Sequence, residues 1–386
     1  MAYPTCWTRS RWSRLILGPA LALAAAAAVA GCTSSPTATP LPGINEVGPT
    51  SAPTSTAALT TAQAVGIFDS YVATTARAAR AGSPALALSV LTGVQQSTFT
   101  AALKSGSTFA NGSPDPNAKG TYGQYRYGPP AVYLPEPAGY PRFFVAGVTR
   151  TFTGTKTGEG MEGWVAGTEV PVDGPALMVF QQASAKTPWL LSSVSQLAAG
   201  TALPTLAVDK NGYVPQVPLT ATNLLAEPEV AGALQAAVVD GGQASTAVKS
   251  VAAGPLTTGM YQGAADHAGG LTPPSGDAYQ WNLMGTAYST FALRTSSGGA
   301  LVLYAMYLNS QVAVPNVISD GSPVVPGPPI AVPADFTALL PAGKAAPRET
   351  LLTQQLLSFA AVDPPAGPDK VSVIAIGGGP NYATGH

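Results

Sequence analysis

Histidine is the side chain best suited to acid–base catalysis near neutral pH, and this chain of 386 residues has two. His267 lies in the segment GAADHAGG, directly after Asp266, and His386 is the last residue given. A Ser-His-Asp triad needs a serine placed so that the histidine can take its proton. No Gly-x-Ser-x-Gly turn presents such a serine. We therefore expect His267 to be a solvated loop residue and His386 to be mobile.

Two pairs of acidic residues are the next candidates, because glycosidases use two carboxyl groups that face each other across a cleft. Glu159 lies near Glu162, and Glu227 lies near Glu229. Neither pair has flanking sequence typical of a glycosidase, so we expect solvated acids in a loop and at a helix start. A hydrolase that uses dispersed carboxylates, with or without His267, stays open as the alternative.

Three short motifs resemble known sites but lack the residues that those sites need. Lys156–Gly158 spells the Lys-Thr-Gly motif of penicillin-binding enzymes, yet the Ser-x-x-Lys of those enzymes is absent. Gly377–Gly379 follows a predicted strand, but no helix follows to direct its N-terminus at a phosphate, so we expect a flexible C-terminal tail. Asp209–Gly212 contains the Asn-Gly pair of a turn and lacks the ligand pattern of a calcium loop. The sequence thus predicts no catalytic residue, no metal site and no cofactor.

Aromatic residues are the remaining candidates for binding. Trp164, Trp189, Tyr279 and Trp281 lie in or beside predicted strands. At the open end of a curved α+β fold, such rings can line a cavity for a lipid, a glycan or a small apolar ligand. We favour the simpler interpretation, in which these rings form part of the core of the sheet, and keep the cavity as the alternative. The binding residues themselves stay unknown from the sequence.

Charge and cysteine content exclude several classes of function. Charged residues make up 10% of the chain, well below the usual quarter, and the formal net charge is −1. No basic patch is visible, so we expect no nucleic-acid partner. The two cysteines are Cys6 and Cys32, and both lie near the N-terminus. The folded part therefore has no thiol for a disulfide, a metal site or catalysis.

The N-terminal residues have the pattern of a secretory signal peptide. Three arginines precede the uncharged run Leu15–Ala30, which is short for a bilayer span of about 17–25 residues. The run ends in Val29–Cys32, which resembles the lipobox of bacterial lipoproteins. This resemblance implies cleavage after residue 31 and a lipid on Cys32, whose two acyl chains would anchor the protein stably. An uncleaved anchor helix, or an ordinary signal peptide with an incidental cysteine, is the alternative.

Residues 32–58 follow the predicted signal peptide of residues 1–31 and are rich in Pro, Ser and Thr. Such a segment buries too little apolar surface to offset the entropy of ordering, so we expect a tether. Thr60 and Gln63 then suit a capping box at the start of a helix that Gly82 can end. Ser83 and Pro84 can open a second helix that continues past Gly93.

Runs of aromatic and β-branched residues between turn signals predict antiparallel strands within 122–197 and 278–314 and a last strand over 369–376. Periodic patterns predict helices over 228–241, 244–253 and 349–360. This order predicts an α+β fold with two similar halves, 59–213 and 214–386, each with helices packed on a curved antiparallel sheet. The runs DGPALMVF and SGGALVLY echo each other between the halves, and a duplication stays open. We expect ten apolar side chains to be buried: Val65, Phe68, Leu86, Leu177, Val179, Trp189, Leu234, Leu301, Leu303 and Val373.

Several segments resemble a family of uncharacterised actinobacterial lipoproteins that carries a domain of unknown function. They are the lipobox, the opening LTTAQAVGIFDSYVATTARAARAGSPALALSVLTG, the segment TPWLLSSVSQLAAGTALP and the hairpin ALRTSSGGALVLY. The resemblance carries no catalytic residues. The halves are also similar to the cone-shaped α+β fold of the nuclear transport factor 2-like superfamily. Together these features predict a lipoprotein on the extracytoplasmic face of the cell membrane, which binds a small apolar ligand or an envelope protein without catalysis.

The anchor can be tested at Cys32. Replacement by alanine removes the only thiol at the predicted cleavage site, so Cys32→Ala is expected to block both processing and membrane attachment. Fractionation of cells and intact mass of the purified protein measure the two effects. An unmodified Cys32, or an intact N-terminus, in the native protein would exclude the lipid anchor.

Overall fold

The computed structural model describes residues 59–104, 125–136, 139–153, 173–271, 278–314, 329–341 and 346–386. Its helices are α1 (Thr61–Ala81), α2 (Pro84–Leu88), α3 (Gly93–Lys104), α4 (Ala231–Gly241), α5 (Thr258–Leu271) and α6 (Ala334–Thr337). Its strands are β1 (Tyr125–Tyr127), β2 (Ala131–Pro135), β3 (Arg142–Phe152), β4 (Gly174–Gln182), β5 (Leu190–Leu197), β6 (Tyr213–Val214), β7 (Ala278–Gly285), β8 (Phe291–Arg294), β9 (Ala300–Ala313), β10 (Thr350–Asp363) and β11 (Ser372–Gly385). Cys32, the signal peptide and the tether lie outside the described residues.

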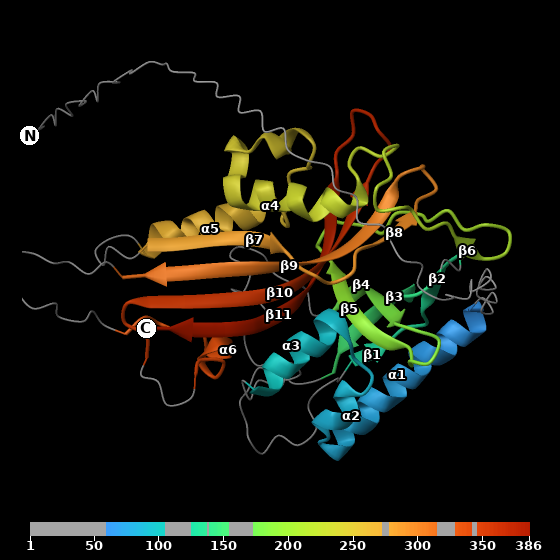
Figure 1. Cartoon of the computed structure of the whole chain (residues 1–386), viewed down its shortest axis with the longest axis horizontal. Coiled ribbons are helices and arrows are strands. Elements are labelled where there is room, and N and C mark those ends of the chain that lie inside the picture. Colours follow the sequence, from blue (N-terminus) through green and yellow to red (C-terminus); the bar gives the residue numbers. More distant parts are fainter. Residues whose placement is uncertain are drawn as a thin grey trace, which may run out of the picture. The chain divides into compact units, whose positions relative to one another are not determined.

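The strands form one curved sheet in the order β6-β2-β3-β4-β5-β11-β10-β9-β7, with β1 beside β3 and β8 beside β9. Every named pair is antiparallel except the two-residue pair of β6 with β2. Helix α1 lies against β2 and α2 packs on α1, while α3 contacts β5, β10 and β11 (Figure 1). Helices α4 and α5 lie beside β7, and α4 also contacts β9. The predicted α+β class with a curved antiparallel sheet is confirmed.

The start of α1 follows directly from local sequence. The Thr60 hydroxyl accepts the backbone N–H of Gln63, and the Gln63 side chain accepts the backbone N–H of Thr60, which completes the predicted capping box. Gly82 ends the helix in the left-handed conformation with a φ of 57°. Ser83 then caps α2, with Pro84 at its first position. These predictions are confirmed, although α2 ends at Leu88 and α3 is a separate helix.

The strand β10 corrects the helix that we predicted over 349–360. All fourteen residues of β10 pair with β9, and twelve of them pair with β11 on the other side. Leu356–Ala361 is buried on both faces, so the apolar run serves two cores rather than one helical stripe. Pairing on both edges and burial on both faces override the helix propensity of Leu, Gln and Ala.

The C-terminal end of the chain corrects a second expectation. Strand β11 begins at Ser372 and continues through Gly377–Gly379 to Gly385, where we expected a flexible tail. The backbone of His386 accepts hydrogen bonds from Arg348 and Glu349 and exchanges two with Thr350, so this residue is held in the structure. A run of glycine residues predicts a loop from sequence alone, because the residues around it do not indicate that strands will pair with it.

The helices between the two groups of strands also differ from expectation. The helix predicted over 244–253 is replaced by two 3₁₀ turns, Gly242–Ala244 and Thr246–Lys249. Helix α5 occupies residues that we expected to form a loop. Of the ten side chains expected in the core, six are buried and four are half-buried; the half-buried ones are Val65, Leu86, Trp189 and Leu234.

The two groups of strands meet at a narrow joint between β5 and β11. Only two residue pairs join these strands, Leu197 with Ala375 and Gln196 with Ile376. Residues 55–386 nevertheless form one unit by their contacts. The division into halves at residue 213 stays a prediction, but their strands share one sheet.

The backbone of β11 at Gly377 lies against β5 with no room for a side chain. A Cβ on Gly377 would overlap the backbone carbonyl of Val194. Ser358 of β10 pairs with Gly377 and donates its hydroxyl hydrogen across it to Val194 O, at 2.7 Å. Ser195 of β5 donates to Ser358 Oγ at 3.2 Å. The absence of a side chain therefore lets three strands bond to one another at a single point.

We predict opposite effects for two glycine-to-alanine substitutions. Gly377→Ala is expected to lower the free energy of unfolding by about 3 kcal/mol or more, because the clash is with backbone atoms that cannot move aside. A Cβ added at Gly66 in α1 has no neighbour within 4 Å. Gly66→Ala should therefore raise the free energy of unfolding by about 0.5–1 kcal/mol, since alanine favours a helix. Urea denaturation of both variants measures the difference. Equal stability of the two variants would contradict the close approach at Gly377.

Candidate functional site

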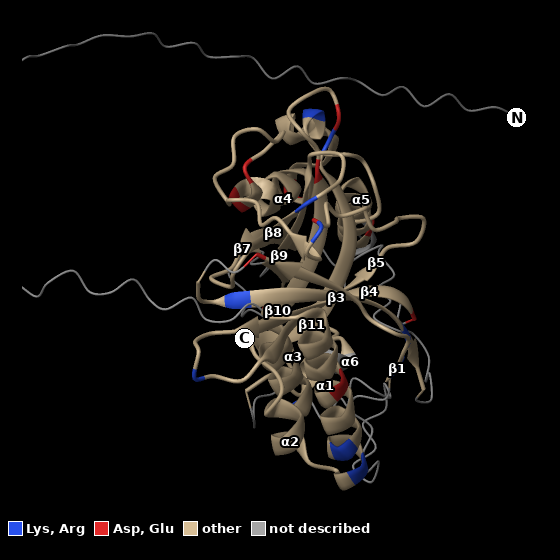
Figure 2. Cartoon of the chain, turned by 90° about the vertical axis from the view of Figure 1, so that its right-hand side faces the viewer, with Lys and Arg blue, Asp and Glu red and all other residues tan. Residues whose placement is uncertain are grey.

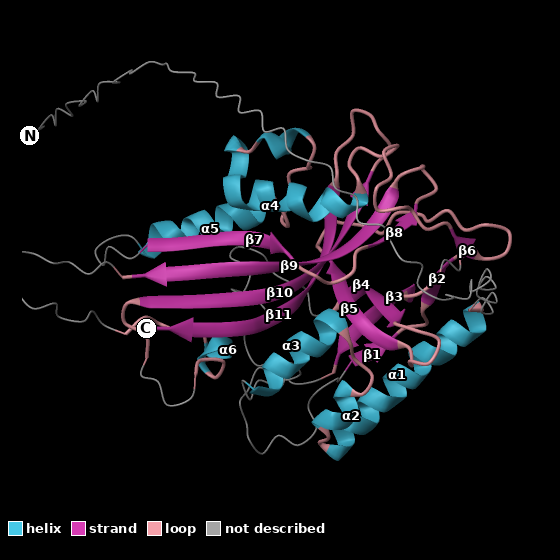
Figure 3. Ribbon diagram, viewed as in Figure 1, coloured by secondary structure: helices cyan, strands magenta, loops and turns pink. Residues whose placement is uncertain are grey.

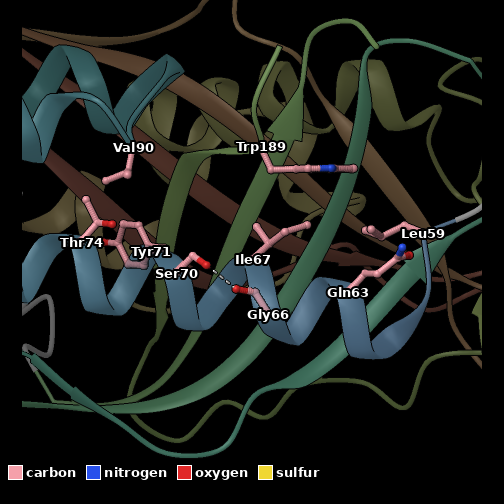
Figure 4. Close-up of a pocket in the computed structure, with 9 residues that line it drawn as sticks. All are labelled: Leu59, Gln63, Gly66, Ile67, Ser70, Tyr71, Thr74, Val90 and Trp189. Atoms are coloured by element: carbon pink, nitrogen blue, oxygen red, sulfur yellow. Dashed lines mark hydrogen bonds between the residues drawn. The ribbon is translucent and has the colours of Figure 1, made fainter. Parts of the chain in front are cut away.

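A groove runs along one side of α1, opposite Trp189 (Figure 4). The helix contributes positions 63, 66, 67, 70, 71 and 74 to its wall, which are spaced three or four residues apart and so lie on one helical stripe. The opposite wall is formed by Val90 and Trp189, and Leu59 closes one end. One helix and the start of one strand thus position most of the lining.

Hydrogen bonds between the backbones fix the wall opposite α1. The N–H of Leu191 donates to Val90 O, and the N–H of Thr92 donates to Leu191 O, both at 2.9 Å. These bonds tie the segment between α2 and α3 to the first residues of β5. The Trp189 ring lies 5.3 Å from the ring of Phe144, which stacks on Phe180 in the core. Trp189 is therefore held in place by the sheet while its outer face borders the groove.

The groove has a volume of about 510 Å³, which is within the range of small-molecule sites. Its lining is aliphatic and aromatic, with an amide from Gln63 and hydroxyl groups from Ser70, Tyr71 and Thr74; no charged side chain is among the lining residues. The Ser70 hydroxyl donates to the carbonyl of Gly66 at 2.7 Å. Burial raises the pKa of the Tyr71 hydroxyl, and so does its neighbour Tyr127. The groove is thus suited to bind an uncharged, largely apolar molecule.

A second hollow of about 390 Å³ shares Leu59 and Trp189 with the groove. It is lined by residues of the β2–β3 connection and by Phe291. Its lining includes Glu136 and Arg142, and the Arg142 guanidinium lies 4.9 Å from the centre of the Tyr140 ring. The ring of Trp189 therefore borders two hollows, one uncharged and one that carries charged side chains.

The structure places His267 in helix α5, not in the loop that we expected. Its side chain is exposed, as expected, and its ring lies 4.7 Å from that of Tyr279. Tyr279 in turn stacks on Trp281, whose ring N–H donates to the carbonyl of Val239 at 3.0 Å. These rings form a cluster between α5 and β7, and none of them lines either hollow. Of the aromatic candidates within the described residues, Trp189 is the one that lines these two hollows.

The remaining sequence candidates are not brought together in the described part of the chain. Glu227 precedes the 3₁₀ turn Pro228–Val230 and Glu229 lies within that turn, directly before α4. Glu159, Glu162, Lys156–Gly158 and Trp164 lie outside the described residues. Within the described ranges, no three His, Cys, Asp or Glu side chains lie close enough to hold a metal ion.

Asp209–Gly212 forms a turn, as predicted. One carboxylate oxygen of Asp209 accepts the backbone N–H of Tyr213 and the backbone N–H of Asn211, each at 2.8 Å. The bond from Tyr213 is the main reason why the pKa of Asp209 is lowered. The carboxylate is thus used within its own turn.

Two carboxyl groups have raised pKa values, which is a common property of catalytic acids. Burial raises the pKa of Asp363 to about 6, although a hydrogen bond from the backbone N–H of Ala226 acts in the opposite direction. Burial also raises the pKa of Asp240. Asp363 lies at the end of β10, and Asp240 accepts the N–H of Leu283 at 2.9 Å. Neither lines the groove or the second hollow, so both hold backbone segments together.

Sequence reasoning assigned α1 to the core and missed the groove. The side chains that we expected to be buried include Val65 and Phe68, whereas the groove uses the adjacent stripe with Gln63, Ile67 and three hydroxyl residues. A helix that packs on one side shows the same periodicity whether or not its flank is open. The absence of charge along that flank is the one signal that could have indicated it.

Comparison with known proteins gives a family and nothing finer. A family model described as "Domain of unknown function (DUF8094)" matches residues 55–379. No curated protein matches the chain, and no solved structure does. The resemblance to a domain of unknown function is confirmed by this match, while the similarity to the nuclear transport factor 2-like fold stays a prediction.

The buried carboxyl of Asp363 predicts how stability depends on pH. Because the pKa of Asp363 is raised from 3.8 to about 6, the folded state binds the proton of this carboxyl more tightly than the unfolded state does. The protonated carboxyl therefore stabilises the fold at low pH, and this contribution is lost as the pH rises from about 4 to 6. The full shift corresponds to at most about 3 kcal/mol. Asp363→Asn carries no charge, so its stability relative to the wild type should rise by up to this amount between pH 4 and pH 7, as urea denaturation measures.

Asp209→Asn provides a control of opposite sign. Because the pKa of Asp209 is lowered, its ionised form stabilises the fold above the ordinary pKa, and the variant should lose stability relative to the wild type as pH rises. The same pH trend in both variants would contradict the burial of Asp363.

Proposed function

The chain belongs to the DUF8094 family, and we propose that it is a membrane-anchored extracytoplasmic lipoprotein that binds a small, uncharged, apolar ligand without chemically changing it. The observation that carries the proposal is the groove beside Trp189, with its aliphatic and aromatic lining and no charged lining residue. A ligand without charge loses little hydration when it enters such a groove, whereas a charged ligand would lose much.

The membrane anchor rests on the N-terminal sequence. The short apolar run and the Val29–Cys32 motif support lipidation of Cys32 with diacylglycerol and a fatty acid such as palmitate. Among the described helices, none is long and apolar enough to cross a bilayer. Membership of an actinobacterial lipoprotein family is part of the same proposal.

The chemistry of the groove supports binding rather than catalysis. Its polar groups are an amide and hydroxyl groups, and none of these titrates ordinarily near neutral pH. A nucleophilic hydroxyl needs an adjacent base, but the Ser70 hydroxyl donates to a backbone carbonyl. A hydrolase with dispersed carboxylates has less support, because Asp363 and Asp240 lie outside both hollows. Docking of an envelope protein is the other role that the anchor allows.

A photoreactive, uncharged alkyl alcohol tests the groove in the full-length protein. We expect the probe to label α1 and the segment that contains Trp189, as peptide mass spectrometry measures. Gly66→Leu projects a side chain into open space in the groove wall, so it should reduce labelling at least about tenfold without loss of stability.

Two control variants make this result specific. Gly66→Ala adds one methyl group at the same position and should retain most of the labelling. Gly285→Leu adds the same side chain in open space at the end of β7, outside the groove, and should not reduce labelling. Labelling that is spread over the surface, or that survives Gly66→Leu, would exclude the groove as the binding site.

A further inference from the structure

A second binding surface lies on the sheet face formed by β7, β9, β10 and β11, which stand side by side in Figure 3. Helix α3 covers part of this face, where Val94 packs on Ala305 and Leu356. Beyond that contact the face bears amides, tyrosines and exposed apolar side chains. We call it the amide face and define it by Asn282, Met284, Tyr307, Asn309, Leu352, Gln354, Asn381 and Tyr382.

A row of four amides crosses the amide face from strand to strand. Asn381 Nδ2 donates to Gln354 Oε1 at 2.9 Å, and Gln354 Nε2 donates to Asn309 Oδ1 at 2.9 Å. Asn309 Nδ2 donates to Asn282 Oδ1 at 3.2 Å. The hydrogen bonds all run in one direction, from β11 to β7, so the amide dipoles add along the row. Within the described part of the chain, the Nδ2 group of Asn282 and the Oδ1 atom of Asn381 end the row with no hydrogen bond of their own.

A β-bulge completes this row. Between Gln354 and Gln355 of β10 the pairing shifts, so that Tyr382 lies opposite Gln354 and Pro380 lies opposite Gln355. Asn381 is the extra residue, and its side chain bonds to Gln354 on the same face. Without the bulge, Asn381 would point to the opposite face from Tyr382. Bulges are common where a side chain must be redirected for a purpose.

Apolar and aromatic side chains border the row. Met284 is 49% exposed, Leu352 is 39% exposed and Tyr382 is 52% exposed. These three residues are half of the six large apolar side chains that are exposed in the described part of the chain. Tyr307 lies beside Met284 in the pairing of β7 with β9. Isolated exposed apolar residues need no explanation, but several on one flat face indicate an interaction site.

The amide face carries no charge. Among the residues of β7, β9, β10 and β11, the one charged side chain is Asp363, which is fully buried at the far end of β10. Lys, Arg, Asp and Glu are also sparse on the chain as a whole, as the predominance of tan in Figure 2 shows. An ionic ligand would therefore find no partner here, and an alkyl chain would cover amides that cost free energy to dehydrate.

We infer that the amide face binds a neutral glycan. Amide groups donate and accept at the same time, as sugar hydroxyls do, so a row of them matches a row of hydroxyls. Tyrosine and methionine side chains can pack against the apolar faces of sugar rings. None of the residues that line the groove belongs to these four strands, so this site is separate from the proposed apolar site.

Neutral tetrasaccharides of glucose and of N-acetylglucosamine serve as probes, with the full-length protein in a detergent that has no sugar headgroup. Saturation-transfer NMR and calorimetry should detect binding of one of them with a dissociation constant of about 1 mM or lower. Gln354→Ala and Tyr382→Ala should each weaken it at least about tenfold. Gln262→Ala, which removes an exposed amide from α5, should leave the affinity unchanged.

Conservative variants separate a binding role from a structural one. Gln354→Glu keeps the size of the side chain but cannot donate to Asn309, so it should lose binding while the protein stays folded by circular dichroism. Tyr382→Phe keeps the ring and should retain binding. Gly66→Leu, which blocks the groove, should have no effect on either probe, so failure of one site does not decide the other.

Three results would overturn the inference. One is the absence of binding for both tetrasaccharides in the wild type. Another is binding that survives Gln354→Ala and Tyr382→Ala. The third is concentration-dependent self-association that Tyr382→Ala abolishes, because the amide face would then be an interface between copies of this chain.

Discussion

The bond of Ser358 to the carbonyl of Val194 determines how the two groups of strands can join, since it passes over a residue with no side chain. Strands β5 and β11 share only two residue pairs, and β10 reaches β5 across Gly377. Strands β1–β6 lie on one side of this joint, together with the groove. The four long strands on the other side, β7, β9, β10 and β11, form the amide face. This close approach of backbones, together with the core that both groups of strands share, links the two surfaces.

Predictions from sequence were correct where the signal is local. The capping box of Thr60 with Gln63, the left-handed Gly82 and the Ser83–Pro84 start need only neighbouring residues, and all of them were confirmed. Predictions failed where long-range pairing decides the outcome. Residues 350–363 have the composition of a helix, but neighbours on both sides hold them in a strand.

The candidate sites were predicted only in part. Trp189 was one of four aromatic candidates for the lining of a cavity, but we expected it to be buried in the core; it is half-buried and borders the groove. The helix stripe opposite it could not be distinguished from an ordinary surface. The amide row could not be predicted from the sequence, because the register of three separate strands aligns Asn282, Asn309 and Gln354. One residue of slip would move each amide to the other face of the sheet.

The position of β11 also determines the order in which the fold can assemble. This strand comes last along the described chain, yet it lies in the middle of the sheet, between β5 and β10. The strands β9, β10 and β11 can pair as neighbours in sequence, but the joint to β5 must close a loop of more than 170 residues, from Leu197 to Ala375. Local pairing of β9, β10 and β11 is therefore expected to precede their union with β5. Until that union forms, the edges of β5 and β11 are open to other strands.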